Sequence, residues 1–161
     1  MTLQKWAYFF SLVFVAIIFV PAGAHLAELL NKIDLPRDQY FVVQNIYAGW
    51  ALFGFPVFAA LFSLLVLVIS LRRERGPFVW ALIAFLCIVA TQVVFWTWTY
   101  PANVATNHWT AIPENWEALR RQWEYAHAAN AVLTFVAIVT LSLSVISWGT
   151  HRHAPHAHAV P

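Results

Sequence analysis

The chain has 161 residues, of which 61% are hydrophobic and only 10% are charged. Soluble domains carry about one quarter charged residues, so the composition excludes an ordinary soluble protein and predicts an integral, multi-pass membrane protein in contact with the lipid bilayer. The net charge of +2 comes from a few basic residues near the ends of apolar runs, which gives no support to nucleic-acid binding. The single cysteine, Cys87, excludes an intrachain disulfide.

Apolar stretches long enough to span a bilayer, which takes about 20 residues, occur four times. They are Trp6–Ala24, Tyr40–Leu71, Pro77–Trp98 and Ala128–Trp148. We therefore predict an all-α, up-and-down bundle of transmembrane helices over residues 1–150, followed by a flexible, His-rich tail over residues 151–161. An even number of spans puts both termini on one side of the membrane, and the basic turn Arg72–Arg75 predicts that this side is the cytoplasm.

The first helix is expected over residues 3–31, with a kink at Pro21, because proline lacks the N–H that the helical hydrogen bonds require. The segment Ala22–Ala24 is typical of a signal-peptide cleavage site. The helical pattern nevertheless continues through Leu30, so we expect this span to be retained.

The remaining helices follow in sequence. A short loop, Lys32–Asp38, leads directly into the second helix, which is expected to run to the end of its apolar stretch. The third helix opens near Pro77 and is expected to end or bend at Pro101. The loop after it, Ala102–Asn115, is the longest, and long loops in compact domains are often lids or binding segments. The fourth helix is expected from about Glu114.

Two polar pairs with mirrored spacing are the main functional signal. His25 and Glu28 form H-x-x-E in the first helix, and Glu124 and His127 form E-x-x-H in the fourth. Residues three apart differ in depth by about 4.5 Å, and the two helices are antiparallel, so each histidine should face the other histidine and each glutamate the other glutamate. Arg120, Glu124 and His127 share one helical face. We predict that the four His and Glu side chains converge near the non-cytoplasmic end.

A transition metal ion is the first interpretation of this site. Imidazole suits iron, copper and zinc, carboxylates favour harder ions, and helix bundles build metal sites from inward-facing Glu and His. Iron or copper is the preferred ion, and zinc is the alternative. Haem with His25 and His127 as axial ligands is a variant, against which the two nearby glutamates argue. The other interpretations are a metal-free site for a polar ligand or a proton, and interhelical contacts that only stabilise the bundle by about 1 kcal/mol each.

Further polar and aromatic residues should lie at the same face of the membrane, as substrate-binding groups or as partners that orient the ligands. They are Gln44, Asn45, Tyr100, Asn103, Trp116 and Arg120. Arg120 precedes Glu124 by one turn, so it is expected to pair with a glutamate or to hold an anionic substrate. The tryptophans of this region are expected either to face lipid and core or to wall a pocket for an aromatic substrate.

Several segments carry a resemblance to a known family. They are A-H-L-A-E-L at residues 24–29, V-Q-N-I-Y at 43–47, F-W-T-W-T-Y-P-A-N at 95–103 and N-W-E-A-L-R-R-Q-W-E-Y-A-H at 115–127. Over about residues 5–148 the chain resembles the anthrone-oxygenase-like family of small four-helix membrane proteins, which includes fungal proteins associated with oxidising anthrones to anthraquinones. The resemblance implies the same fold and a shared polar pattern of His25, Gln44, Asn103, Arg120, Trp123, Glu124 and His127. It transfers no residue role and no cofactor.

The sequence therefore predicts a membrane-bound oxidoreductase or oxygenase that acts on a lipophilic small molecule, with an aromatic compound as a candidate, at the His/Glu site. The alternative is a non-enzymatic bundle that binds a lipid or a quinone, or that serves in a homo-oligomer or as an accessory subunit of a larger membrane complex. Transport or proton relay is disfavoured, because no continuous polar path crosses the other half of the predicted bundle.

Overall fold

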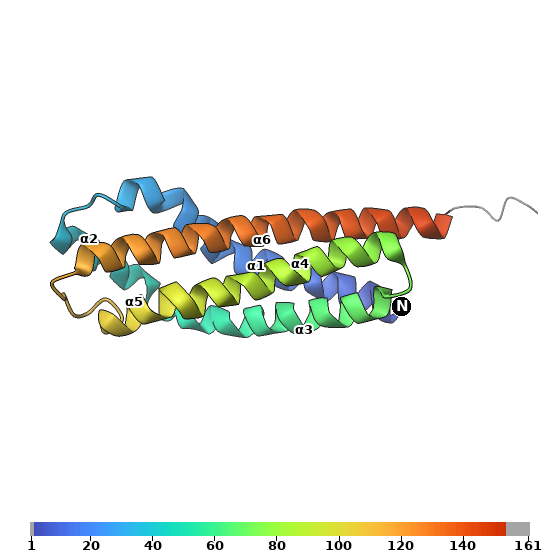
Figure 1. Ribbon diagram of the computed structural model, residues 1–161, viewed down its shortest axis with the longest axis horizontal. Helices are drawn as coiled ribbons and strands as arrows, with labels where there is room; N and C mark the ends of the chain where they lie inside the picture. The colour runs from blue at the N-terminus through green and yellow to red at the C-terminus, as the bar shows by residue number, and fades with distance from the viewer. Residues whose placement is uncertain (1, 154–161) are drawn as a thin grey trace, which may run out of the picture.

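Four long helices run up and down the molecule beside one another (Figure 1). The computed structural model describes residues 2–153, with the side chains of residues 2–150. The spans are α1 (Leu3–Lys32), the segment Trp50–Leu71 that contains α3 (Gly54–Leu71), the segment Arg75–Ala105, and α6 (Trp116–His153). Each is long and apolar enough to cross a bilayer. The chain is an integral, multi-pass membrane protein, and the predicted all-α bundle is confirmed.

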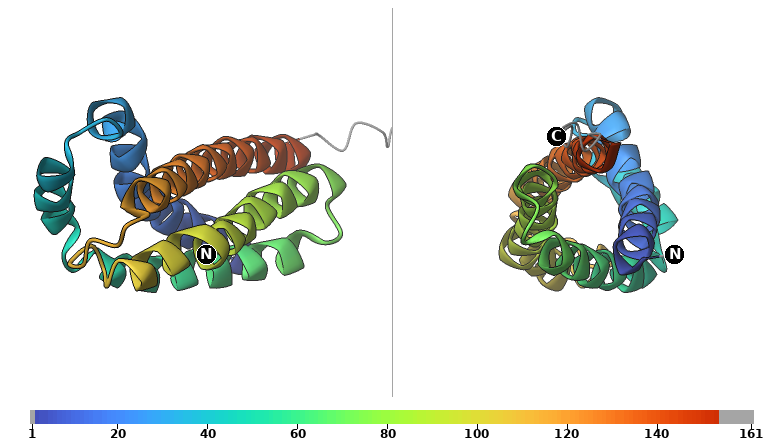
Figure 2. Two further views of the ribbon diagram at one scale, coloured as in Figure 1. Left: turned by 60° about the vertical axis from the view of Figure 1, so that its left-hand side comes forward. Right: turned by 90° about the vertical axis from the view of Figure 1, so that its right-hand side faces the viewer.

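The four spans form a closed ring. α1 packs against α3 and α6, and α4 (Arg75–Val94) packs against the same two helices, as the end-on view shows (Figure 2, right). Small residues at the contacts, such as Ala84 and Ala137, let the backbones approach closely. Large apolar side chains such as Phe62, which is 70% exposed, point outward, where lipid covers them. The fully buried core includes Val15, Leu64, Leu67, Ile88 and Leu141.

The two ends of the bundle differ. The N-terminus, the turn between α3 and α4 and the end of α6 lie at one end (Figure 1). At the other end, two short helices, α2 (Arg37–Gln44) and α5 (Tyr100–Ala105), lie beside the start of α6. A separate cluster of buried side chains, formed by Tyr40, Ala102, Trp109 and Trp123, caps this end. The cytoplasmic placement of the termini stays a prediction.

The predicted second span, Tyr40–Leu71, is wrong as a single helix. After α2 the chain makes one 3-10 turn, η1 (Asn45–Tyr47), and the span begins only at Trp50. Gly49 lies between them with φ +86°, in the left-handed region that glycine adopts readily and that ends a right-handed helix. Because of this break, Tyr47 reaches α1 instead of lying within a continuous transmembrane helix.

The third span continues past Pro101, where an end or a bend was predicted. A π-helical turn, η3 (Phe95–Thr99), comes directly before α5, and Pro101 then occupies the first turn of α5, where its missing N–H is tolerated. The Gln122 side-chain amide of α6 donates to the carbonyl oxygen of Trp98 at 2.8 Å, which supplies a partner within the irregular turn. The helix therefore extends to Ala105, and the loop that follows is shorter than predicted.

α6 begins at Trp116, close to the expected start, and its backbone continues to His153. The predicted division into a bundle at residues 1–150 and a tail at residues 151–161 stays a prediction. The remainder of the predicted His-rich tail, residues 154–161, lies outside the described residues.

Candidate functional site

The candidate site lies between the end of α1 and the start of α6. On α1, His25, Glu28 and Lys32 follow at spacings of three and four residues, so they share one helical face. On α6, Glu124 and His127 face them, and their helix begins a few residues earlier. His25, Lys32 and Glu124 are 4%, 2% and 1% exposed, whereas the Glu28 side chain is 29% exposed, so the site is buried except at Glu28.

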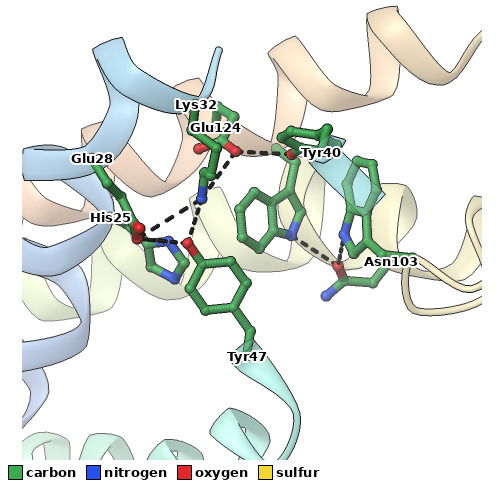
Figure 3. Close-up of polar contacts among 9 residues, drawn as sticks. His25, Glu28, Lys32, Tyr40, Tyr47, Asn103 and Glu124 are labelled. Atoms are coloured by element: carbon green, nitrogen blue, oxygen red, sulfur yellow. Dashed lines mark hydrogen bonds and ion pairs between the residues drawn. The ribbon is translucent and has the colours of Figure 1, made fainter. Parts of the chain in front are cut away.

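Lys32 occupies the centre of the site (Figure 3). Its Nζ lies 3.1 Å from Glu124 Oε1 and 3.8 Å from Glu28 Oε1, and it donates a hydrogen bond to Tyr47 Oη. The same ammonium lies 4.4 Å from the ring centroid of Tyr47 and 5.0 Å from that of Trp123, which is within cation–π range. Glu28 and Glu124 are therefore bridged by Lys32, the last residue of α1.

Two tyrosines complete the hydrogen bonds of the glutamates. Tyr40 Oη donates to Glu124 Oε1 at 2.8 Å, and Tyr47 Oη donates to Glu28 Oε1 at 2.6 Å. Burial, together with the neighbouring Glu124 carboxylate, raises the pKa of Tyr40 above its ordinary value, and burial and Glu28 do the same to the pKa of Tyr47. Both phenols therefore stay protonated and act as donors to the carboxylates.

The two histidines lie against each other. Their ring centroids are 4.0 Å apart with 33° between the planes. His25 is also packed by Tyr47, Trp50 and Trp123, at centroid distances of 4.6, 5.3 and 5.0 Å. Nδ1 of His25 and Nε2 of His127 are buried and have no hydrogen-bond partner within the described protein. The site thus offers ring nitrogens inside an aromatic enclosure, which is an arrangement that can accept or donate a proton.

Asn103 connects this enclosure to the loop before α6. Its Oδ1 accepts hydrogen bonds from the indole N–H groups of Trp109, at 3.1 Å, and of Trp123, at 2.8 Å (Figure 3). Residues 107–109 have φ values of 45°, 55° and 65°, so three consecutive non-glycine residues adopt left-handed backbone conformations. Each such residue costs about 1–2 kcal/mol. The packing of Trp109 over Tyr40 and Trp123 offsets this strain.

One prediction was that Arg120 forms an ion pair with a glutamate, but it contacts other groups. Its Nη1 donates to the carbonyl oxygen of Leu35 at 2.7 Å, and its guanidinium lies 5.3 Å from the Tyr40 ring and 4.7 Å from the Trp116 ring. The side chain is 6% exposed. Arg120 therefore holds the loop between α1 and α2 and brings a second positive charge to the site beside Lys32.

The four predicted metal ligands converge, but their geometry does not fit a metal centre. The Lys32 ammonium lies where a cation bound by both glutamates would have to lie. A separation of 4.0 Å between the ring centroids, with 33° between the planes, leaves no room for a haem between His25 and His127. Among the described residues, no group of three or more His, Cys, Asp or Glu side chains could hold a metal ion.

The other predicted residues divide into two groups. Gln44, Asn103, Trp116 and Arg120 lie in or against the site, with Gln44 only 5% exposed. Asn45 is exposed, and Tyr100 is 43% exposed and packs on Trp96 at 5.0 Å, so neither belongs to it. Our sequence reasoning missed Lys32, Tyr40 and Trp50. Lys32 was detectable, because it lies four residues after Glu28 and extends the same helical face.

Fold and site together define an integral membrane four-helix bundle with a buried Lys–Glu–Tyr–His cluster at its capped end. Comparison with family models, with curated proteins and with solved structures finds no match for the chain. The similarity to the anthrone-oxygenase-like family therefore stays a prediction from the four segments that carry it.

Proposed function

We propose that this protein is a membrane-bound oxidoreductase that acts on a lipophilic aromatic substrate, with the His25–His127 pair as proton acceptor. The observation that supports this most is the pair itself, two imidazoles in contact behind a wall of Tyr47, Trp50 and Trp123. Nε2 of His127 has no hydrogen-bond partner within the described protein, and Nδ1 of His25 lies 3.6 Å from Glu28 Oε1 without a hydrogen bond. Aromatic walls favour a flat, apolar substrate. A buried base favours removal of a proton from an acidic C–H or O–H group.

The reaction class that fits is oxidation of an activated methylene group by dioxygen. An imidazole nitrogen takes one proton from the methylene, and the resulting carbanion is delocalised into the aromatic rings. Dioxygen then accepts the electrons. One of its oxygen atoms becomes the new carbonyl oxygen, and the other leaves as water with the two hydrogens of the methylene. The resemblance to the anthrone-oxygenase-like family supports the same class of substrate.

The test uses the purified full chain in lipid nanodiscs with anthrone as the probe. Oxygen uptake and the absorbance of anthraquinone are followed, with the protein-free rate subtracted. We expect His25→Asn and His127→Asn to lower the rate by about 10²–10⁴-fold, the usual contribution of a positioned acid or base. His108→Asn is the matched control, because His108 is exposed on the loop and its left-handed backbone suits asparagine. Equal rates in all three variants would refute the assignment.

A second candidate function, binding of a lipid or a quinone, is favoured by a different feature. An apolar hollow of about 400 Å³ lies between α1 and α3. Its lining includes Trp6, Phe10, Phe14 and Phe62. Native mass spectrometry of the protein, released gently from nanodiscs, is expected to detect a bound acyl lipid or quinone that Phe10→Ala weakens. The same spectrum reports whether the chain forms a homo-oligomer or joins a larger membrane complex.

A further inference from the structure

The surroundings of the Lys32 ammonium have the composition of a binding site for a primary amine. A primary ammonium has three N–H donors. Nζ donates a hydrogen bond to Tyr47 Oη and forms ion pairs with Glu124 Oε1 at 3.1 Å and with Glu28 Oε1 at 3.8 Å. The Tyr47 and Trp123 rings add cation–π contacts at 4.4 and 5.0 Å.

Because Lys32 is buried, its positive charge needs partners within the protein. Lys32 is 2% exposed, and a buried charge is tolerated only when it is paired and hydrogen-bonded. The side chains of Lys32 and Arg120 together carry two positive charges, and those of Glu28 and Glu124 carry two negative charges. A divalent metal ion added to this set would leave an excess of two positive charges in a medium of low dielectric constant. The Lys32 ammonium and a metal ion therefore exclude each other.

We infer that Lys32 is the resident cation of this site, an internal primary ammonium in the place where the sequence pattern predicts a metal ion. The site without that side chain is then a receptor for a small alkylammonium ion. This inference does not depend on the oxidoreductase proposal, because it concerns binding and stability and not turnover.

The test removes the ammonium and supplies cations from solution. The Lys32→Ala variant of the full chain in nanodiscs is heated in the presence of propylammonium, tetramethylammonium or Mn²⁺. We expect the variant to unfold several degrees below the wild type, and propylammonium to recover at least half of the loss. Tetramethylammonium should recover none, since it has no N–H to donate. Mn²⁺ should bind to neither protein at more than a tenth of an equivalent, because no group of three or more His, Cys, Asp or Glu side chains among the described residues could hold it.

Two further variants make the result specific. Lys5→Ala removes an exposed lysine from the other end of the bundle and should respond to no added cation. Lys32→Ala combined with Glu124→Gln keeps the number of positive and negative charges equal and guards against misfolding of the single variant. In this double variant the apparent dissociation constant for propylammonium should rise at least tenfold, because the nearest carboxylate is gone.

The inference is overturned by any of three results. One is a full equivalent of metal on wild-type protein with Lys32 intact. Another is a Lys32→Ala protein whose unfolding temperature propylammonium does not change. The last is recovery by propylammonium that the Glu124→Gln change leaves unaltered, since the amine would then act at another place.

Discussion

Replacing Asn103 by leucine is expected to destabilise the capped end of the bundle by about 2–4 kcal/mol. The Asn103 carbonyl oxygen is the acceptor for the indole N–H groups of Trp109 and Trp123, at 3.1 and 2.8 Å. Both tryptophans are buried, with 7% and 4% exposure. Leaving one buried donor without a partner costs about 1–3 kcal/mol. Two unpaired donors would together cost about 2–6 kcal/mol. We expect the upper limit to fall to about 4 kcal/mol, because the loop that carries Trp109 can turn outward and expose its indole N–H to water.

The assay is equilibrium unfolding of the purified protein in mixed micelles, followed by far-ultraviolet circular dichroism. Trp109→Phe and Trp123→Phe remove the N–H groups and keep a ring in each position. In the protein with both changes, Asn103→Leu should cost less than about 1 kcal/mol, because no donor is left unpaired, so the cycle should show a coupling of about 1–3 kcal/mol. If Asn103→Leu costs the same in both backgrounds, the two indole hydrogen bonds do not stabilise the cap.

Other substitutions test the site and the helix break with the same assay. Tyr40→Phe removes the donor to the Glu124 carboxylate and should cost about 1.5–3 kcal/mol, the usual value for a hydrogen bond to a charged group; a loss below about 0.5 kcal/mol would mean that the bond is not formed. Because the folded protein raises the pKa of Tyr40 and Tyr47, their protonated forms favour the folded state, so stability should fall as the pH rises above their ordinary pKa of 10.0. Tyr47→Phe should reduce this loss between pH 8 and pH 11. Gly49→Ala should cost about 1–2 kcal/mol through its φ of +86°, whereas Gly54→Ala, with open space and a helical backbone, should be neutral or stabilising; equal effects would argue against the left-handed turn.

Local breaks in the helices were the least predictable part of the fold. The apolar stretch Tyr40–Leu71 reads as one span because hydropathy does not register backbone conformation, and the left-handed turn at Gly49 divides it. At Pro101 the opposite error arose, since a π-helical turn before the proline lets the span continue to Ala105. In both cases the outcome depends on which neighbouring groups can satisfy the freed backbone atoms, and that information is not local.

The convergence of the four His and Glu side chains was predicted, and the lysine at the centre of the site was not. Helical spacing placed His25 opposite His127, and the two rings do lie against each other, with centroids 4.0 Å apart. The same spacing extends to Lys32, but the proline and aspartate of the next segment indicated a loop there, so this residue was left out. A glutamate pair without a visible cation predicts a metal ion, whereas a glutamate pair with a buried lysine between them does not.

The sequence by itself determined the class of this protein, because length and hydrophobicity alone decide whether a helix can cross a bilayer, and four stretches meet that requirement. It also determined which faces of α1 and α6 are polar, since helical periodicity is a local property. Only the tertiary structure decided what lies between those faces. Which cation balances the Glu28 and Glu124 carboxylates, and which side chains pack around Trp123, depends on contacts between residues as distant along the chain as Lys32 and Glu124, or Asn103 and Trp123.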